Sequence, residues 1–309
     1  MFKLGIERIS AYESLFKGKR VGLITNPTGV DQTLKSTIDI LHELKVLKAL
    51  YAPEHGVRGD VQAGDKLDGY IDPKTGVPVY SLYGNTKKPT QAMLEAIDIL
   101  CFDIQDVGAR FYTYIYTMAY SMIAAKEENI KFVVFDRPNP LGDMVEGNLL
   151  ELDFRSFVGY YALPQRHGMT TGELAILFNE VFEIRCDLEV VQMEGYKRTT
   201  SILEYDYPYV LPSPNLPTKE SLFYYMITTP FEGTNISEGR GTTKPFQFIG
   251  APFFDADEVI KRFYALGSSP LTLRKVYFTP TFSKHQGVLC EGLELYLNDF
   301  NNNNLVYEG

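Results

Sequence analysis

Short apolar runs alternate with amphipathic stretches along the first 185 residues. The runs typical of buried strands are RVGLIT (20–25), VLKALYA (46–52), PVYSLYG (78–84), DILCFDIQ (98–105), KFVVFD (131–136) and FVGYYALP (157–164). Between the first two runs, residues 33–45 repeat leucine or isoleucine every three or four positions, which predicts an amphipathic helix. Helices are also expected over 89–97, 111–128 and 172–182, the last capped by Thr170 or Thr171.

Alternation of strands and helices, with strands that are apolar on both faces, is typical of a parallel sheet covered by helices. Residues 1–185 are therefore predicted to form an open, doubly wound α/β domain. The composition then changes: residues 196–220 are rich in Pro, Tyr and Ser, and residues 230–252 in Gly and Thr. One helix is expected at 255–266, followed by short β-like runs. Residues 186–309 are therefore predicted to form a second, smaller α+β domain.

Composition and charge narrow the class of partner. Hydrophobic residues make up 45% of the chain and charged residues 22%, the balance of a globular protein. The net charge of −9 argues against nucleic acid, although a local positive patch would suffice for an acidic small ligand. No apolar run approaches the roughly 20 residues that span a bilayer. The start, MFKLGIERIS, lacks the layout of a signal peptide, so the chain is expected to be cytoplasmic as given, or exported if a leader has been removed.

Motifs for cofactors and metals are absent from the sequence. No GxGxxG follows the first predicted strand and no GxxxxGK[ST] occurs, so a nucleotide or nicotinamide cofactor is not expected. The four histidines are scattered without HExxH, and the three cysteines are widely spaced, so no metal site and no disulfide framework are expected. The nucleophile elbow GxSxG is missing as well. Acid–base chemistry led by carboxylates is what remains.

Polar groups follow the predicted strands at the points where the strands end, which is where open α/β sheets bind ligands. The candidates on this edge are Asn26, Glu54, His55, Asp103, Gln105, Asp106, Arg110, Arg137 and Asn139.

Several of these candidates have a structural alternative. Glu54 can be a solvated turn carboxylate, and His55 can orient a neighbour or simply pack. Asp103 lies in an apolar strand end, where an unpaired carboxylate is costly, so it is expected to pair with Arg110 or Arg137. Asp106 can cap the helix that is expected to start near residue 111.

A second group of polar residues lies in the loop FEGTNISEGRGTTKPF at 231–246. Its glycines let the backbone approach a ligand closely or turn sharply. Glu232, Asn235, Glu238 and Arg240 show no helical periodicity. This loop is either part of a binding site or a surface loop of solvated charges.

Seven motifs occur in one order: GLITNPTGVD, APEHGVRGD, DIQDVGARFYTYIYTM, VFDRPNPLG, RHGMTTGELA, SPNLPT and FEGTNISEGRGTTKPFQFIGAP. Together they resemble the DUF1343 family, over about Gly22 to Gln286. Characterised members of that family are exo-acting β-N-acetylmuramidases of the NamZ type, which remove N-acetylmuramic acid from the non-reducing end of peptidoglycan fragments. The resemblance implies a Rossmann-like domain with a smaller domain, a site in the cleft between them, and Glu54 as the catalytic acid. The resemblance implies that members continue past a KHQG motif, here at 284–287, so the chain is expected to lack the family's C-terminal end.

The leading hypothesis is a glycosidase that acts on a peptidoglycan-derived saccharide. Such an enzyme needs a carboxylic acid that protonates the leaving oxygen and a second group at the oxocarbenium-like centre. Candidates for the second role are Asp103, Asp106, Glu232 and Glu238, and then Tyr112 and Tyr114. An arginine can pair with the lactyl carboxylate of muramic acid, and the candidates are Arg110, Arg137 and Arg240. The side chains expected to bind other sugar groups are Asn26, His55, Gln105, Tyr112, Tyr114, Asn139 and Asn235. The alternative is a non-catalytic muropeptide- or sugar-binding protein on the same fold.

Overall fold

The computed structural model of the chain describes residues 2–53, 56–59, 69–84, 86–301 and 304–309. It divides into two units. The first comprises Met1–Asp143, Leu150–Leu163 and Gly168–Pro212, and the second comprises Met144–Leu149, Pro164–His167 and Ser213–Gly309.

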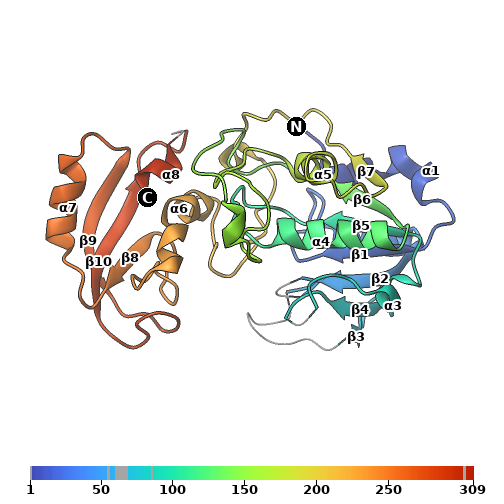
Figure 1. Ribbon diagram of the computed structural model, residues 1–309, viewed down its shortest axis with the longest axis horizontal. Helices are drawn as coiled ribbons and strands as arrows, with labels where there is room; N and C mark the ends of the chain where they lie inside the picture. Colours follow the sequence, from blue (N-terminus) through green and yellow to red (C-terminus); the bar gives the residue numbers. More distant parts are fainter. Residues whose placement is uncertain (1, 54–55, 60–68, 85, 302–303) are drawn as a thin grey trace. The chain divides into compact units, whose positions relative to one another are not determined.

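A seven-stranded sheet forms the centre of the first unit (Figure 1). Its strands are β1 (Val21–Thr25), β2 (Leu47–Ala52), β3 (Tyr70–Ile71), β4 (Pro78–Ser81), β5 (Ile99–Asp103), β6 (Lys131–Phe135) and β7 (Leu188–Val191). The order is β3-β4-β2-β1-β5-β6-β7, and every neighbouring pair is parallel except β3 with β4. The predicted open, mostly parallel sheet is confirmed. The chain order reverses between β1 and β5, which makes this pair the topological switch point.

Successive side chains of a strand point to opposite faces of a sheet, and β1 and β5 are buried along their whole length. Helices therefore cover both faces of this sheet. They are η1 (Gly5–Tyr12), α1 (Glu13–Phe16), α2 (Thr37–Glu43), α3 (Gln91–Leu94), α4 (Tyr114–Glu127) and α5 (Thr171–Glu180), with two short turns, η2 (Leu152–Phe154) and η3 (Ile202–Glu204). On one face Phe102 packs in a cluster with Met118 of α4 and Leu174 of α5. On the other, Cys101 packs in a cluster with Leu41 of α2.

Two expected elements of the first unit differ in the structure. The helix predicted from residue 33 begins only at Thr37, since Leu34 adopts a left-handed backbone (φ 69°) and Ser36 caps the helix by accepting a hydrogen bond from the Asp39 amide. The run at 157–164 is not a strand: Gly159 makes one isolated bridge, to Ser156, and Tyr161 and Leu163 pack into the core instead.

The sixth parallel strand is β7, which lies after residue 185 and pairs with β6. Because this strand completes the first sheet, the first unit continues to Pro212, beyond the boundary expected at residue 185.

A three-stranded antiparallel sheet forms the centre of the second unit. Its strands are β8 (Phe248–Ala251), β9 (Leu271–Phe278) and β10 (Cys290–Leu297), in the order β8-β10-β9. The helices of this unit are α6 (Ser221–Thr228), η4 (Thr229–Gly233), α7 (Ala256–Ala265) and α8 (Leu305–Glu308). Asp255 caps α7 by accepting from the Glu258 amide, and α7 contacts β9 and β10 (Figure 1). Within the described residues, no helix has the length and apolar character that a bilayer-crossing helix needs.

Candidate functional site

The loops that follow β1, β5 and β6 are tied to one another at the carboxyl edge of the first sheet. Thr25 ends β1 and its hydroxyl donates to the carbonyl oxygen of Asp103, which ends β5, at 2.8 Å. The Gln105 amide donates to the Thr28 hydroxyl at 2.9 Å, and the Gln105 side chain donates to the Pro138 carbonyl at 2.8 Å. The expected convergence of these strand ends is therefore present.

The switch point between β1 and β5 is filled by the chain itself. The Asn26 side-chain oxygen accepts hydrogen bonds from the Thr28 amide (2.9 Å) and the Thr28 hydroxyl (2.5 Å). A Cβ on Gly29 would lie 2.0 Å from the Thr25 hydroxyl and 2.9 Å from the Asp103 carbonyl, so only glycine fits there. Asn26 therefore orders its own loop.

Asp103 and Arg137 form a buried ion pair. The Arg137 guanidinium donates to both carboxylate oxygens, Nε to Oδ1 at 2.5 Å and Nη2 to Oδ2 at 2.9 Å. The Thr37 hydroxyl also donates to this carboxylate, and Arg137 Nη2 donates to the Val30 carbonyl at 2.8 Å. Burial opposes the charge of Arg137, but Asp103 outweighs burial and raises the pKa of the guanidinium. The prediction that Asp103 is paired is confirmed, and its partner is Arg137.

Asp106 and Arg110 lie in the buried turn that precedes α4. One Asp106 oxygen accepts from the Gly108 amide at 2.8 Å, whereas α4 begins only at Tyr114. Arg110 donates to the Leu163 carbonyl at 2.6 Å, and burial lowers the pKa of its guanidinium. The turn is thus built around these two side chains.

Two aromatic candidates, Tyr112 and Tyr114, lie at the start of α4. Their rings meet edge to face, with centroids 4.9 Å apart. The Tyr112 hydroxyl donates to the Pro212 carbonyl at 2.8 Å, which fixes the direction of its ring. Tyr114 is buried in the core.

The loop after β6 contains Asn139 and, before it, Asp136, a carboxylate that is not among the predicted site residues. Asn139 accepts from the Leu141 amide at 2.9 Å and donates to the Met169 carbonyl at 3.1 Å. Asp136 accepts from the Gly172 amide, at the start of α5, at 2.7 Å. Desolvation raises the pKa of Asp136 to about 6, although the Gly172 amide opposes the shift.

Asp136 also borders a cavity of about 220 Å3, which Glu173 and Tyr196 help to line. The sequence signal for Asp136 was its position directly after an apolar strand, the same signal that selected Asp103.

Glu54 and His55 lie outside the described residues. The strand that precedes them, β2, ends at Ala52 and pairs with β1. Their roles stay predictions.

In the second unit, the predicted residues Glu232, Glu238 and Arg240 form one group with Lys284, and these four residues are here called the loop cluster. Arg240 Nη2 lies 2.6 Å from Glu232 Oε1, and Arg240 Nε lies 3.2 Å from Glu238 Oε1. Glu238 is only 2% exposed, and the guanidinium also lies over the Phe246 ring, 5.2 Å from its centroid.

Lys284 joins two loops that are distant in the sequence. Its ammonium group donates to the carbonyls of Phe231 (2.7 Å) and Ile236 (3.0 Å) and to the Glu238 carboxylate (3.0 Å). The neighbouring His285 places Nε2 2.7 Å from the carbonyl oxygen of Asn235, whose side chain is exposed. Lys284 belongs to the KHQG motif but is not among the predicted site residues.

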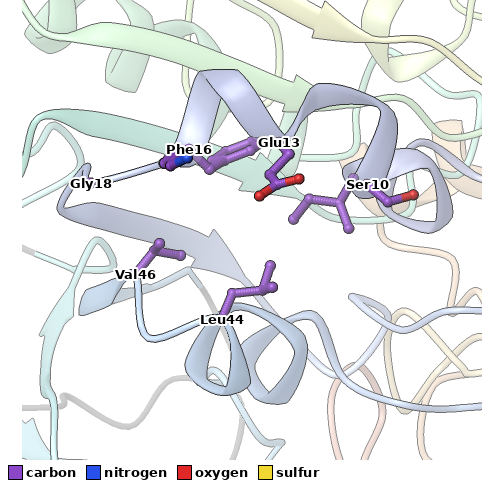
Figure 2. A pocket seen from close by; sticks show the side chains of 8 residues that line it. Ser10, Glu13, Phe16, Gly18, Leu44 and Val46 are labelled. Atoms are coloured by element: carbon purple, nitrogen blue, oxygen red, sulfur yellow. The ribbon is translucent and has the colours of Figure 1, made fainter.

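Figure 2 shows a separate groove in the first unit, of about 330 Å3, between η1, α1 and the residues that follow α2. Phe16, Leu44 and Val46 help to line it. Val46 precedes β2, so this groove lies toward the amino ends of the strands and contains no predicted site residue.

Carboxylates with ligand-like spacing occur once in the part of the chain that the structure describes, at Asp255, Asp257 and Glu291. Lys275 pairs with two of these carboxylates, at 2.7 Å from Asp257 and 3.0 Å from Glu291. The arrangement is that of a surface ion-pair network.

Comparison with known proteins relates the chain to one family. Residues 21–220 match the family model described as Exo-beta-N-acetylmuramidase NamZ, N-terminal, and residues 223–307 match the corresponding C-terminal model. The chain is 60% identical over 291 residues to the Peptidoglycan beta-N-acetylmuramidase NamZ of Bacillus subtilis (strain 168), which covers 93% of this chain and 70% of that relative.

Two solved structures of DUF1343 family proteins from Bacteroides fragilis NCTC 9343 are also similar. The first has a TM-score of 0.90 and 41% identity, over 98% of this chain and 80% of that chain. The second has a TM-score of 0.79 and 36% identity, over 95% of this chain and 76% of that chain. These matches confirm the family resemblance predicted from the seven ordered motifs. The chain belongs to the exo-β-N-acetylmuramidase NamZ family.

Proposed function

We propose that this chain is a glycoside hydrolase that releases N-acetylmuramic acid from the non-reducing end of peptidoglycan fragments. The observation that carries the proposal is the 60% identity, over 93% of the chain, to a relative named as a peptidoglycan β-N-acetylmuramidase. The fold supports it, because polar groups gather at the carboxyl edge of the first sheet, where open α/β folds bind ligands.

Glu54 is the proposed general acid, which donates a proton to the glycosidic oxygen as the bond breaks. It follows β2, the neighbour of the switch-point strand β1. At the carboxyl edge of the first sheet, Asp103 is already paired with Arg137 and Thr37, which favours a structural role for that carboxylate. The candidates that remain for the second catalytic group are Asp106, Glu232 and Glu238, followed by Tyr112 and Tyr114.

Arg240 is the proposed partner of the lactyl carboxylate that distinguishes muramic acid from glucosamine. Arg137 is committed to Asp103, and Arg110 is buried and donates to Leu163. Arg240 keeps about 29% of its side chain exposed and lies among glycines that allow close approach. A substrate carboxylate would replace Glu232, the more exposed of its two partners.

The test is release of free N-acetylmuramic acid from a synthetic β-N-acetylmuramide and from a muramic-acid-terminated disaccharide. The matched β-N-acetylglucosaminide serves as the control substrate. We expect sugar release from the muramic acid substrates and far less from the control. Binding of the disaccharide without release of sugar would overturn the proposal in favour of a muropeptide-binding protein.

A further inference from the structure

A groove of about 460 Å3 in the second unit combines aromatic rings with hydroxyl groups. Its wall consists of one glycine, four threonines and three phenylalanines, from the loop that begins at Gly241, from β8 and from the segment 278–282. Rings supply apolar contact area and hydroxyls supply oriented polar contacts, which is how proteins bind ligands with one apolar face and a polar edge. A pyranose ring has this character, with C–H bonds on its faces and hydroxyls at its edge.

The backbone that holds this groove is fixed by internal hydrogen bonds. The Thr242 hydroxyl donates to the Gly239 carbonyl at 2.6 Å, and the Thr281 amide and hydroxyl both donate to the Gly241 carbonyl, at 2.9 and 3.0 Å. Gly241 has φ +79°, and a Cβ there would lie 2.6 Å from the Phe282 carbonyl oxygen. Glycine is therefore required for the close contact between the two loops, and the groove is preformed.

Two of the threonines are available to a ligand. The hydroxyls of Thr243 and Thr279 are exposed and make no hydrogen bond within the described part of the chain. They differ in this from Thr242 and Thr281, whose hydroxyls hold the loops together.

The aromatic part of the wall has a fixed base and an open edge. Phe278 is buried and lies against Phe248, with ring centroids 5.5 Å apart. Phe282 is 49% exposed, while its backbone is held against Gly241. An open ring on a held backbone can stack on a ligand at little entropic cost.

Charge decides which sugar fits. None of the described residues that line the groove is ionisable, whereas Arg240 of the loop cluster directly precedes Gly241. This uncharged wall offers the carboxylate of muramic acid no cationic partner. A neutral N-acetylhexosamine needs none.

We propose that this groove is a saccharide-binding subsite for the neutral N-acetylglucosamine units of a glycan. In this subsite the sugar stacks on Phe282 and hydrogen-bonds to Thr243 and Thr279. The identity of the natural glycan as a peptidoglycan fragment rests on the proposed function, whereas the binding of N-acetylglucosamine oligomers does not.

The experiment is an NMR titration of the full chain with chitotriose, the uncharged trimer of N-acetylglucosamine. We compare the wild type with Phe282→Ala and with the double variant Thr243→Val and Thr279→Val. Phe253→Ala is the matched control, since Phe253 is also an exposed phenylalanine of the second unit (62%) but does not line the groove. We expect Phe282→Ala to raise Kd about ten-fold, the double variant to raise it several-fold, and Phe253→Ala to leave it unchanged.

Three results would overturn the subsite: no binding of chitotriose by the wild type, an unchanged Kd in both groove variants, or the same loss in Phe253→Ala as in Phe282→Ala. Amide spectra of each variant verify that the second unit is folded, and the threonine-to-valine variant, which conserves shape, tests the groove independently of the ring. Chitotriose binding in a chain that releases no N-acetylmuramic acid would refute the proposed function and leave the subsite standing. Release of N-acetylmuramic acid by a chain that does not bind chitotriose would refute the subsite alone.

Discussion

The variant Asp103→Asn distinguishes a structural role of this carboxylate from a catalytic role. Asp103 is fully buried and Arg137 is 3% exposed, so Asp103→Asn leaves a guanidinium in the core without its counter-charge. Removing one partner of a buried pair costs about 3–5 kcal/mol, which shifts the unfolding equilibrium about 100- to 4,000-fold. That is a large part of the roughly 5–15 kcal/mol by which domains are stable.

The assay is urea unfolding followed by circular dichroism and tyrosine fluorescence, since the chain has 21 Tyr and no Trp. The double-mutant cycle includes Asp103→Asn, Arg137→Met and the double variant. The double variant removes both charges and should recover a substantial part of the lost free energy of unfolding. Glu127→Gln is the control, because Glu127 pairs with Lys88 at the surface, where such a pair contributes about 0.2–1 kcal/mol. If Asp103→Asn unfolds within about 1 kcal/mol of the wild type and yet loses turnover, the structural interpretation is refuted and Asp103 acts on the substrate.

Three further expectations concern Glu54, Asp136 and Arg240. Glu54→Gln should lower kcat on a β-N-acetylmuramide by about 100-fold or more with an unchanged urea midpoint, and near-normal kcat would move the acid elsewhere. The pKa of Asp136, about 6, lies above its unfolded value of about 4, so the ionised carboxylate destabilises the fold above pH 6 and this cost fades as the pH falls toward 4. Asp136→Asn should therefore raise the unfolding free energy by up to about 3 kcal/mol at pH 7.5 and by little at pH 4; an equal effect at both pH values contradicts this. Arg240→Ala should reduce the kcat/KM preference for muramic acid over N-acetylglucosamine substrates about ten- to a hundred-fold. Arg262→Ala, which changes an exposed arginine, should leave this preference unchanged. If Arg240→Ala also leaves the ratio of the two kcat/KM values unchanged, the selectivity comes from other groups.

Local sequence patterns predicted the elements whose folding is decided locally or by a continuous apolar run. β5 is apolar on both faces and is buried along its whole length, as its sequence indicates. The helix α5 is capped by Thr170, one of the two residues expected, which forms a capping box with Glu173. The strand ends converge because the topology brings them to one edge, so Asn26, Asp103, Gln105 and Asn139 could be placed before the structure was known.

What the sequence could not supply depends on distances between segments far apart in the chain. Either Arg110 or Arg137 could have paired with Asp103, and only the packing of β5 against β6 brings Arg137 to it. The run at 157–164 has the composition of a strand, but the place beside β6 is taken by β7, which comes later in the chain. Lys284 is separated by 46 residues from Glu238, and no periodicity connects the two.

The three hydrogen bonds of Lys284 also bear on how this family can be recombined. Since its ammonium group holds Phe231, Ile236 and Glu238, the loop at 231–246 owes its conformation to a residue outside it. A chimera that imports this loop from a relative, but keeps a different side chain at position 284, would receive the sequence without the anchor. The two segments therefore form one exchangeable module, and a design that alters substrate preference through this loop has to transplant both.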